Sequence, residues 1–520
     1  MNEMMAHILA FGVSGVSGFP VQVEVFSTSG MPGMEVIGLP DASVRESRER
    51  VNAAILNSGK EMPPRRITIN LAPADTKKEG PGFDLPIAVG LLAANRQIHI
   101  IPSIDLSKTV FFGELSLDGR IQPVRGALAM AISASEYGYT DIILPAGNAM
   151  EVACIQGMNI YPVCHLKEVI GHLEGTLPIR PQKQMDYEEL KRHRTVAVDM
   201  SQVKGQEGAR RALEVAAAGG HNMLMIGAPG SGKTMLARCL PGILPPLSFQ
   251  ESLETTRIFS IAGKIAPGSG LMVERPFCSP HHSASVASLI GGGMNAAPGE
   301  VSLSHNGVLF LDELPEFSRG ALEALRQPLE DGVVTVSRVR NQACYQSSFM
   351  MIAGMNPCPC GYYGSRQREC RCTPQEIRRY LDRVSGPLLD RIDIQVEVDS
   401  VPVAEIRSSA PAESSAAVAA RVEKARILQM DRYAGSGFFC NAQLDNNAIR
   451  KYCSMTQEAE NLLHLAVEKM SLSMRAYHRV IKVARTLADL SGSDRIGMAE
   501  IAEAIQFREL DQKYWRNGTL

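Results

Sequence analysis

The sequence predicts a multidomain α/β protein with an N-terminal α+β module, a parallel α/β nucleotide-binding core and a C-terminal helical module. The chain has 520 residues, which is more than one hydrophobic core usually serves. Its hydrophobic pattern changes twice, each time after a polar stretch rich in proline or serine. The middle part alternates apolar strands, glycine turns and helices, which is typical of a parallel sheet.

The first module is expected over residues 1–173. β-Branched runs at 21–26 and 66–71 are typical of strands, and the patterns at 43–56 and 127–137 are typical of helices. The polar, proline-bearing stretch 174–195 is expected to be a linker.

The other boundaries follow the same signals. The α/β core is expected over 196–400, a second linker over 401–416, a helical lid over 417–510 and a tail over 511–520.

Composition limits the classes of function. Apolar residues at 45% and charged residues at 21% are typical of globular chains. The net charge of −2 excludes a global basic field, so nucleic acid would have to be bound by a local cluster of cations. The sequence shows no signal-peptide pattern and no long apolar run, which predicts a cytoplasmic protein with no membrane contact. Its eleven cysteines are then expected as reduced thiols or metal ligands.

The most specific motif follows an apolar strand at 223–226 and fits G-x-x-x-x-G-K-[ST]. In this motif backbone N–H groups wrap the phosphates of ATP, the lysine reaches the β- and γ-phosphates, and the hydroxyl binds Mg²⁺. The predicted ATP-binding residues are Gly227, Ala228, Pro229, Gly230, Ser231, Gly232, Lys233 and Thr234.

A second apolar strand, 308–311, ends in Asp312 and Glu313. Two carboxylates at the end of a buried strand can take separate roles in nucleotide hydrolysis. We assign Asp312 to the Mg²⁺ shell and Glu313 to the general base that polarises the attacking water.

A third strand, 350–353, leads to Asn356. Its amide could hold the attacking water, although asparagine before proline is also a common turn residue. Its place after the two earlier motifs favours the catalytic interpretation.

Four of the eleven cysteines, in the pattern C-x-C-x₉-C-x-C, lie within fifteen residues. This density predicts a structural Zn²⁺ knuckle over 358–372, although free thiols or a redox role fit the unusual spacing too. The predicted ligands are Cys358, Cys360, Cys370 and Cys372.

Taken in order, five motifs resemble the magnesium-chelatase-like branch of the AAA+ ATPases, and within it the ComM/YifB family of DNA branch-migration helicases. They are the P-loop, LFLDE at 309–313, MNPCPCG at 355–361, SGPLLDRID at 385–393 and SMRAYHRVIKVARTLADL at 473–490.

This resemblance assigns Asn356 as sensor 1, Arg391 as an arginine finger for the neighbouring subunit and Arg475 as sensor 2. The charge of a guanidinium near the γ-phosphate stabilises the transition state. From spacing alone, Arg391 could instead pair with Asp390 or Asp393, and Arg475 could lie on a solvated helix face with Arg479 and Lys482. An arginine finger in trans implies a ring, and the family resemblance implies a homo-hexamer.

The first module resembles the Lon-protease-like fold, a ribosomal S5 domain 2-like α+β sandwich, in the segments 77–86 and 113–126. The expected positions of the serine nucleophile and lysine base hold Gly82 and Leu128. We therefore expect no peptidase activity.

The implied function is an ATP-dependent DNA helicase or translocase that acts on single-stranded and branched DNA, in homologous recombination and the uptake of transforming DNA. Candidate DNA contacts are hairpins within 266–293 and 331–342, the latter with Arg338 and Arg340, and an arginine-rich window at 366–383 that could equally be solvated or face a subunit. The alternative is a chelatase-type or protein-remodelling ATPase that does not act on DNA.

Overall fold

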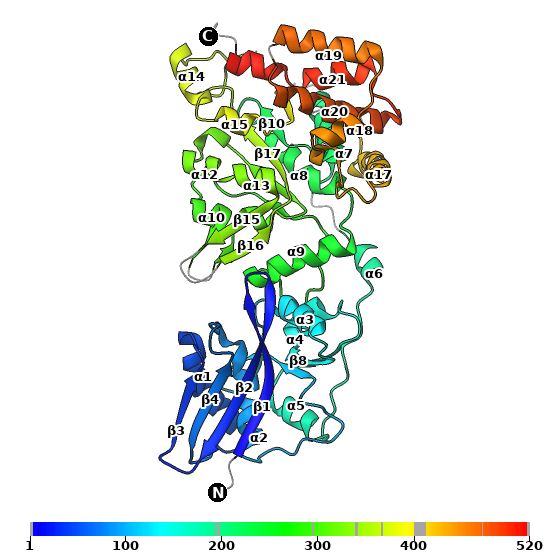
Figure 1. The fold of residues 1–520 in the computed structure, drawn as a ribbon. Helices are drawn as coiled ribbons and strands as arrows, with labels where there is room; N and C mark the ends of the chain where they lie inside the picture. The colour runs from blue at the N-terminus through cyan, green and yellow to red at the C-terminus, as the bar shows by residue number, and fades with distance from the viewer. Residues whose placement is uncertain are drawn as a thin grey trace.

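The computed structural model of the chain describes residues 4–192, 194, 198–293, 296–337, 342–365, 368–399, 412–470 and 472–516. Three regions follow one another along the length of the molecule (Figure 1). The N-terminal α/β region lies at one end, the core with the P-loop lies in the middle, and the helical region caps the other end. None of the described helices combines the length and the apolar character that crossing a bilayer requires.

The N-terminal region is built on a seven-stranded mixed sheet in the order β3-β4-β2-β1-β5-β8-β9. The long strands β1 and β2 pair antiparallel, whereas β5, β8 and β9 pair in parallel. The predicted strands and helices of this region are confirmed. Its elements are β1 (Met4–Ser14), β2 (Ser17–Thr28), β3 (Gly33–Ile37), α1 (Ala42–Asn57), β4 (Arg66–Ala72), α2 (Asp84–Ala94), β5 (Thr109–Phe111), β6 (Glu114–Leu115), β7 (Ile121–Gln122), α3 (Ala127–Glu136), β8 (Asp141–Pro145), α4 (Ala146–Val152), β9 (Asn159–Val163) and α5 (Leu166–Leu173).

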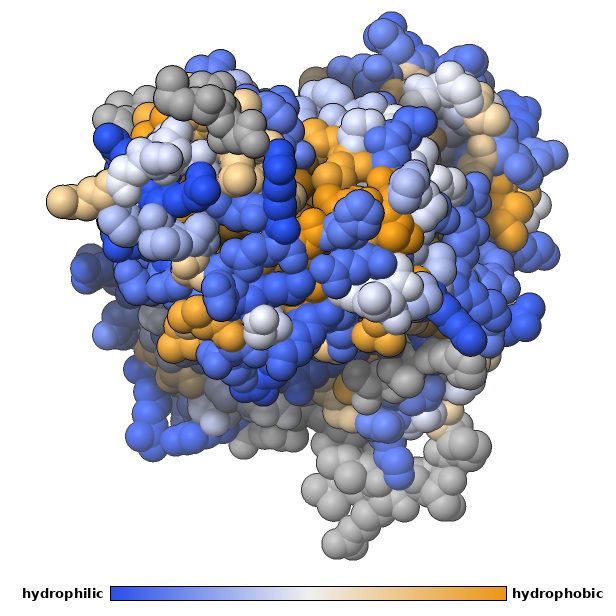
Figure 2. Space-filling model, turned by 90° about the horizontal axis from the view of Figure 1, so that it is seen from below, coloured by the Kyte–Doolittle hydropathy of each residue, from blue (hydrophilic) through white to orange (hydrophobic). Residues whose placement is uncertain are grey.

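Figure 2 shows the end of the molecule that the N-terminal region forms. This surface is mostly polar, with an apolar patch near the middle of the view.

The core is a five-stranded sheet in the order β11-β14-β17-β10-β18, with every pair parallel. Its central strands have fully buried runs such as Met-Leu-Met-Ile in β10, which parallel strands covered on both faces require. The predicted parallel α/β pattern is therefore confirmed. The elements are α7 (Glu207–Gly219), β10 (Met223–Ile226), α8 (Lys233–Ile243), α9 (Phe249–Ala262), β11 (Phe277–Cys278), α10 (Val286–Ile290), β12 (Gly291–Gly292), β13 (Ala297–Pro298), α11 (Glu300–Leu303), β14 (Val308–Leu311), α12 (Arg319–Ala324), α13 (Arg326–Asp331), β15 (Val333–Ser337), β16 (Gln342–Gln346), β17 (Met350–Met355), α14 (Pro374–Leu381), α15 (Gly386–Leu389) and β18 (Ile394–Glu397).

The C-terminal region is helical, as predicted. It comprises α17 (Ser415–Arg432), α18 (Asn446–Tyr452), α19 (Gln457–Met470), α20 (Met474–Ser491) and α21 (Met498–Gln506), followed by a short π-helix at Asp511–Arg516. Most of the second predicted linker lies outside the described residues. The first contains the short helix α6 (Tyr187–Arg192), and the hydroxyl of its buried Tyr187 donates to the carbonyl of Leu247 at 2.8 Å. This segment is thus packed against the core.

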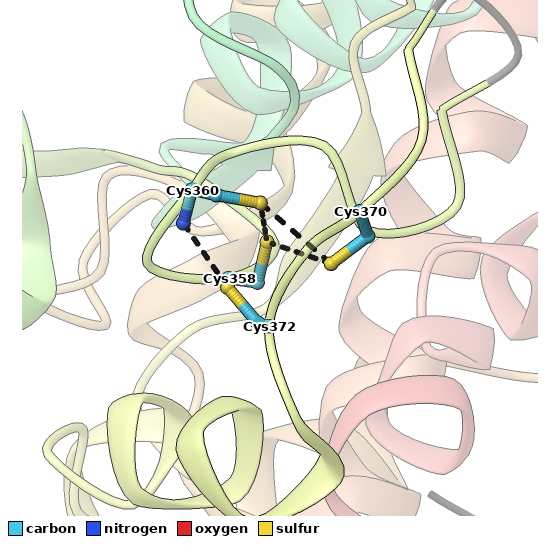
Figure 3. Close-up of side chains that lie close together, drawn as sticks. All are labelled: Cys358, Cys360, Cys370 and Cys372. Atoms are coloured by element: carbon cyan, nitrogen blue, oxygen red, sulfur yellow. Dashed lines mark hydrogen bonds between the residues drawn. The ribbon is translucent and has the colours of Figure 1, made fainter.

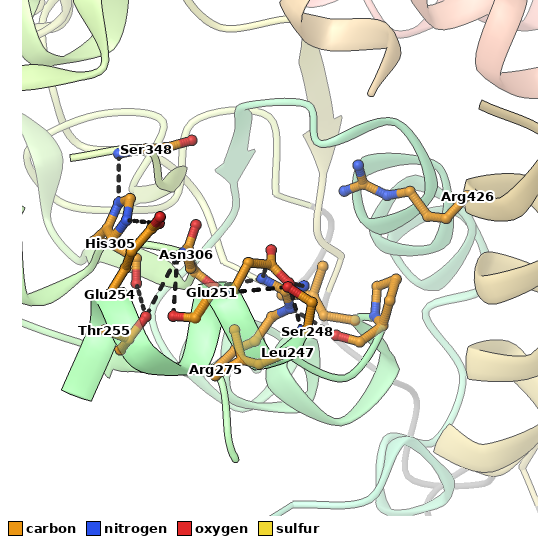
Figure 4. Close-up of polar contacts among 12 residues, drawn as sticks. Leu247, Ser248, Glu251, Glu254, Thr255, Arg275, His305, Asn306, Ser348 and Arg426 are labelled. Carbon is orange, nitrogen blue, oxygen red and sulfur yellow. Dashed lines mark hydrogen bonds and ion pairs between the residues drawn. The ribbon is translucent and has the colours of Figure 1, made fainter. Parts of the chain in front are cut away.

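Helix α9 lies where the N-terminal region meets the core, and it contacts α3. A partly buried polar network fixes α9 to the core (Figure 4). The guanidinium of Arg275 donates to Glu251 at 3.1 Å and to the carbonyl of Asn306 at 2.7 Å. His305 contacts Glu254 at 3.3 Å, and this hydrogen bond is the main reason that the pKa of Glu254 falls to about 2.

Candidate nucleotide and metal sites

The P-loop connects the end of β10 to the start of α8. At Gly227 a Cβ atom would lie 2.2 Å from the carbonyl oxygen of Val398, so only glycine fits between the neighbouring backbones. Gly232 has φ +93°, which glycine adopts without strain, and the helix begins at the next residue, Lys233. The N-terminus of α8 thus faces the loop, and phosphate groups bind at this position in such motifs.

Lys233 lies inside this loop. Its ammonium donates to the carbonyl oxygens of Gly227 at 2.8 Å and Ala228 at 3.0 Å, and it lies 3.3 Å from Oδ1 of Asn356. Burial lowers the pKa of Lys233, while the charges of Asp312 and Glu313 act in the opposite direction. The fold therefore brings the P-loop lysine and the predicted sensor asparagine together, although 123 residues separate them in sequence.

The two predicted Mg²⁺ ligands also meet. The hydroxyl of Thr234 donates to Oδ2 of Asp312 at 2.7 Å, and Oδ1 of Asp312 accepts from the backbone N–H of Glu313 at 3.0 Å. A hydroxyl and a carboxylate at this distance can occupy neighbouring positions around a Mg²⁺ ion that also holds phosphate oxygens.

Glu313 follows at the end of the same strand in a left-handed backbone conformation, φ +52°. Its side chain is 54% exposed, and one carboxylate oxygen lies 3.0 Å from Nδ1 of His282. Sequence reasoning missed this contact between His282 and the predicted base. The contact could be found only from the parallel pairing of the 308–311 strand with Phe277–Cys278, which the sequence did not reveal.

Arg391 lies just before β18, at the edge of the core sheet opposite the P-loop, and it is not free. Its side chain is buried, donates to the carbonyl of Pro387 at 2.5 Å and pairs with Glu330. The intrachain alternatives, Asp390 and Asp393, pair with other arginines. A role of Arg391 in a neighbouring subunit stays a prediction, and it would require the Glu330 contact to open.

Arg475 begins helix α20. Its side chain is 65% exposed and lies 3.8 Å from Asp390. The solvated face expected to include Arg479 and Lys482 is not observed, because both side chains are largely buried. Arg479 instead pairs with Asp393 at 2.7 Å.

This pair belongs to a link between the core and the lid that sequence reasoning missed. His221 contacts Asp393 at 3.2 Å and the hydroxyl of Thr486 on α20 at 2.8 Å. Burial alone would raise the pKa of Asp393, but the charge of Arg479 and the hydrogen bond from His221 hold it well below its usual range. The helical region is therefore held to Asp393, the residue just before β18, by charge as well as by packing.

The four cysteines of the predicted knuckle converge (Figure 3). Their sulfur atoms all lie within 4.8 Å of one another, and three of the pairs measure 3.3, 3.7 and 3.6 Å. Four thiolates at about 2.3 Å around a tetrahedral Zn²⁺ would be about 3.8 Å apart, and a disulfide would bring two of them to about 2.05 Å. The geometry fits a tetrathiolate metal site.

Burial and backbone N–H groups act in opposite directions on the cysteine thiols. Backbone N–H groups of Tyr363 and Cys360 donate to the sulfurs of Cys358 and Cys372 at 3.3 and 3.4 Å. Burial raises the pKa of Cys358 to about 12; it opposes ionisation of Cys360 too, but hydrogen bonds from N–H groups lower the pKa of that thiol to about 6. The close approach of the four sulfurs, with backbone donors to some of them, therefore fits a site for a metal ion such as zinc.

The knuckle lies against the P-loop. A Cβ atom on Gly361 would come within 2.5 Å of the Pro229 ring and 3.8 Å of the side-chain amide carbon of Asn356. On its other side, Tyr363 makes an edge contact with Tyr514 in the C-terminal segment. The cysteine loop thus connects the P-loop with the C-terminal segment around Tyr514.

In the N-terminal region, Gly82 lies in a 3₁₀ turn at Pro81–Phe83 and Leu128 is fully buried in α3. Neither residue carries a nucleophile or a base. Nearby, Lys78 and Asp84 are buried, but Lys78 donates to backbone carbonyls and Asp84 is held by Arg50.

Of the two expected hairpins, the second is observed as β15–β16. Its tip, with Arg338 and Arg340, lies outside the described residues. The first expectation was wrong in its position: 266–293 is mainly loop and helix, and the hairpin β12–β13 spans Gly291–Pro298. The arginine window borders a groove of about 860 Å³, with Arg319, Arg378, Arg379 and Arg383 in its lining.

Comparison with known proteins places the chain among relatives over almost its full length. Models for magnesium chelatase subunit ChlI match residues 199–406, 23–148 and, for its C-terminal part, 412–508. A protein named YifB from Salmonella typhimurium is 44% identical over 96% of both chains. Competence protein ComM from Haemophilus influenzae is 41% identical over 95% of this chain and 96% of its own.

A Lon protease from Brevibacillus choshinensis is 30% identical over 22% of this chain and 15% of its own, so that likeness is partial. The matches to chelatase models and to YifB and ComM extend from the N-terminal region to the lid. The chain belongs to the magnesium-chelatase-like ComM/YifB family of AAA+ proteins.

Proposed function

We propose that this protein is an ATP-dependent DNA translocase that promotes branch migration during homologous recombination and the uptake of transforming DNA. It would work in the cytoplasm as a homo-hexamer on single-stranded and branched DNA. The main observation that supports this proposal is a convergence of side chains at one edge of the core sheet. These are Lys233, Thr234, Asp312 and Asn356.

In this proposal the P-loop and Lys233 bind the phosphates of ATP, and Thr234 and Asp312 hold Mg²⁺. Glu313 polarises the attacking water, and Asn356 orients it. Mg²⁺ supplies charge neutralisation of the phosphates when bound. Arg475, exposed at the start of α20, is available to report the nucleotide state to the lid, and Arg391 is the candidate for a neighbouring site.

Two observations support an action on DNA. The hairpins β12–β13 and β15–β16 lie side by side in the core region, where β12 contacts β15. A relative of nearly equal length bears the name competence protein. The cysteine knuckle is proposed as a structural zinc site, and the N-terminal region as a non-proteolytic, Lon-like domain that builds the ring or contacts DNA.

The second candidate is a chelatase-type or protein-remodelling ATPase, which the family description of the core favours. Turnover of ATP, measured with no DNA, with single-stranded DNA and with a four-way junction at two salt concentrations, separates the two. The translocase proposal predicts stimulation by DNA that weakens with salt, and ATP-dependent movement of the junction.

Glu313→Gln should bind ATP but lose turnover by about 10²-fold or more. Glu316→Gln is a matched control on the same segment. Glu316 is also a carboxylate, but it pairs with Arg383 at 2.8 Å. Hydrolysis that depends on Glu313 but is indifferent to DNA, with no junction movement, would reject the translocase and favour the second candidate.

A further inference from the structure

A basic groove of about 860 Å³ opens beside the segment that follows the 308–313 strand. One wall is the turn at 315–319, which begins two residues after Glu313, and the other wall is α14 with the residues that follow it. Helix α14 lies at the lid end of the core, whereas β15–β16 lies towards the N-terminal region (Figure 1). Neither hairpin contributes a described residue to the lining, so the groove is a separate surface.

The sequence of α14 makes one wall of the groove basic. Ile377, Tyr380 and Leu381 have the spacing of one helix face, and this face is buried in the core. Positions i, i+3, i+4 and i+7 of the opposite face then share a second stripe, which borders the groove. This stripe consists of Gln375, Arg378, Arg379 and Asp382.

Three guanidinium groups in the lining have no partner among the described residues. Arg319, Arg378 and Arg379 are exposed, and within that part of the chain their side chains make no ion pair or hydrogen bond. Arg383, in contrast, pairs with Glu316 at 2.8 Å, so these two charges neutralise each other. The groove therefore presents three cations that are available to an anionic ligand.

The chemistry of the lining fits the phosphates of a nucleic-acid strand. A guanidinium donates two parallel hydrogen bonds to a phosphate group, and several cations along one groove release the counterions of a strand. Asp382 is the acid of the described lining that remains outside the Arg383 pair, so positive charge is in excess. The aromatic residue of the lining, Phe317, is only 4% exposed, which leaves the bases no ring to stack on.

We propose that this groove binds the phosphodiester backbone of a DNA strand through Arg319, Arg378 and Arg379, independently of base sequence. The groove would add a second contact to the two hairpins, on the segment directly after the proposed catalytic base. The inference rests on the DNA-directed part of the proposed function, but not on ATP-driven movement.

The test measures the affinity of the full-length protein for a fluorescent oligo(dT) strand of about 30 nucleotides, with a non-hydrolysable ATP analogue and at several salt concentrations. One variant combines Arg319→Ala, Arg378→Ala and Arg379→Ala, and a second is Asp382→Asn. An abasic strand of the same length is the competitor. The Tm and the sedimentation of each protein are measured too.

The control variant removes the same number of exposed cations from helices of the lid, away from the groove. It combines Lys424→Ala, Arg450→Ala and Lys469→Ala.

We expect each lost phosphate contact to weaken binding about fivefold at about 0.1 M salt, because a single strand contributes a slope of about 0.7 per phosphate. The triple groove variant should bind about 100-fold more weakly, and its salt slope should fall by about 2. The lid control should stay within about threefold of the unmodified protein. Asp382→Asn should bind up to about fivefold more tightly, and the abasic strand should compete almost as well as oligo(dT).

An affinity of the triple variant within about threefold of the lid control would overturn the groove as a DNA site. A changed sedimentation that accompanies the loss would overturn it too, because the groove would then be a contact between subunits. An abasic strand that competes more than about tenfold worse would assign binding to the bases instead.

Asp382→Asn keeps the test decisive if the triple variant is unstable, because a misfolded protein does not bind more tightly. Unchanged or weaker binding by Asp382→Asn would contradict the electrostatic account. Binding through the groove with no ATP-dependent movement of a junction would reject the translocase and leave the groove site standing. Junction movement with full affinity in the triple variant would do the reverse.

Discussion

Two buried lysines in different regions bind backbone carbonyls in almost the same way, yet their surroundings differ. Lys78 in the N-terminal region has no exposed surface, and its ammonium contacts the carbonyls of Pro73 and Thr76. Lys233 contacts the carbonyls of Gly227 and Ala228, but Asn356 lies beside it. Burial lowers the pKa of both lysines.

The acids of the two regions differ in the same way. Asp84 is fully buried, accepts from Arg50 at 2.7 and 3.0 Å and from the N–H of Leu115 at 3.1 Å, and burial raises its pKa to about 6. Asp312 and Glu313 lie at the open end of a strand, with the Glu313 side chain more than half exposed. Asp84 is thus paired within the fold, whereas Asp312 and Glu313 remain accessible to a ligand.

This contrast separates a structural charge cluster from the one proposed to be catalytic. A charge that is surrounded by its own partners stabilises the fold, and a charge at an open edge of a parallel sheet can exchange its partners for phosphate and metal. Substitutions in the first cluster should therefore change stability, and substitutions in the second should change turnover.

The largest effect is expected for Asp312→Asn. Loss of the metal-side carboxylate should lower ATP turnover by about 10²-fold or more and raise the Mg²⁺ concentration needed for half-maximal rate. A Mg²⁺ titration of turnover measures both. Turnover of Asp312→Asn within threefold of the unmodified protein would remove the distinction between the clusters.

The second effect concerns the cysteine knuckle. Cys372→Ser should lose the zinc, lower the Tm by about 5 °C and weaken ATP binding, because the knuckle packs on Pro229. Cys344→Ser is the control, since Cys344 is exposed on β16 outside the cluster. Metal analysis that finds far less than one zinc per chain, with all four thiols open to alkylation, would contradict the metal site.

The third effect is on stability alone. Arg50→Ala leaves the Asp84 carboxylate buried and unpaired, which should cost about 3–5 kcal/mol in the N-terminal region. Denaturant unfolding detects this loss, and ATP turnover per folded chain should stay within about twofold. A specific loss of turnover at full stability would show that the N-terminal charges act in hydrolysis.

The smallest effect is expected for Lys78→Met. The carbonyls of Pro73 and Thr76 would lose their donor, at a cost of about 1–3 kcal/mol. Denaturant unfolding of the two proteins measures the difference, which should be absent from the ATP kinetics. An unchanged stability would mean that Lys78 contributes no more to this loop than an apolar side chain.

Local motifs were the most predictable part of the molecule. The P-loop, the strand before Asp312 and the helices α1 and α3 depend on adjacent residues, so their sequences are sufficient to predict them. The convergence of the four cysteines was predicted from their density within fifteen residues.

Contacts that depend on tertiary packing were not predictable. Arg391 pairs with Glu330, 61 residues earlier, because α13 ends beside the 386–393 segment. Arg479 and Lys482 have the spacing of a solvated helix face, but Arg479 pairs with Asp393 of the core and Lys482 donates to the carbonyl of Ala442 within the helical region. His282 could be connected with Glu313 only after β11 was known to pair with β14.

The most direct test of the central claim is ATP turnover in the presence of Mg²⁺ by Lys233→Met and Lys78→Met, measured side by side on folded protein. Both variants remove an ammonium from a set of backbone carbonyls. Lys233→Met should lose turnover by about 10²-fold or more, whereas Lys78→Met should stay within about twofold of the unmodified protein. Turnover retained in Lys233→Met, or lost equally in both variants, would contradict the assignment of the catalytic cluster to the core.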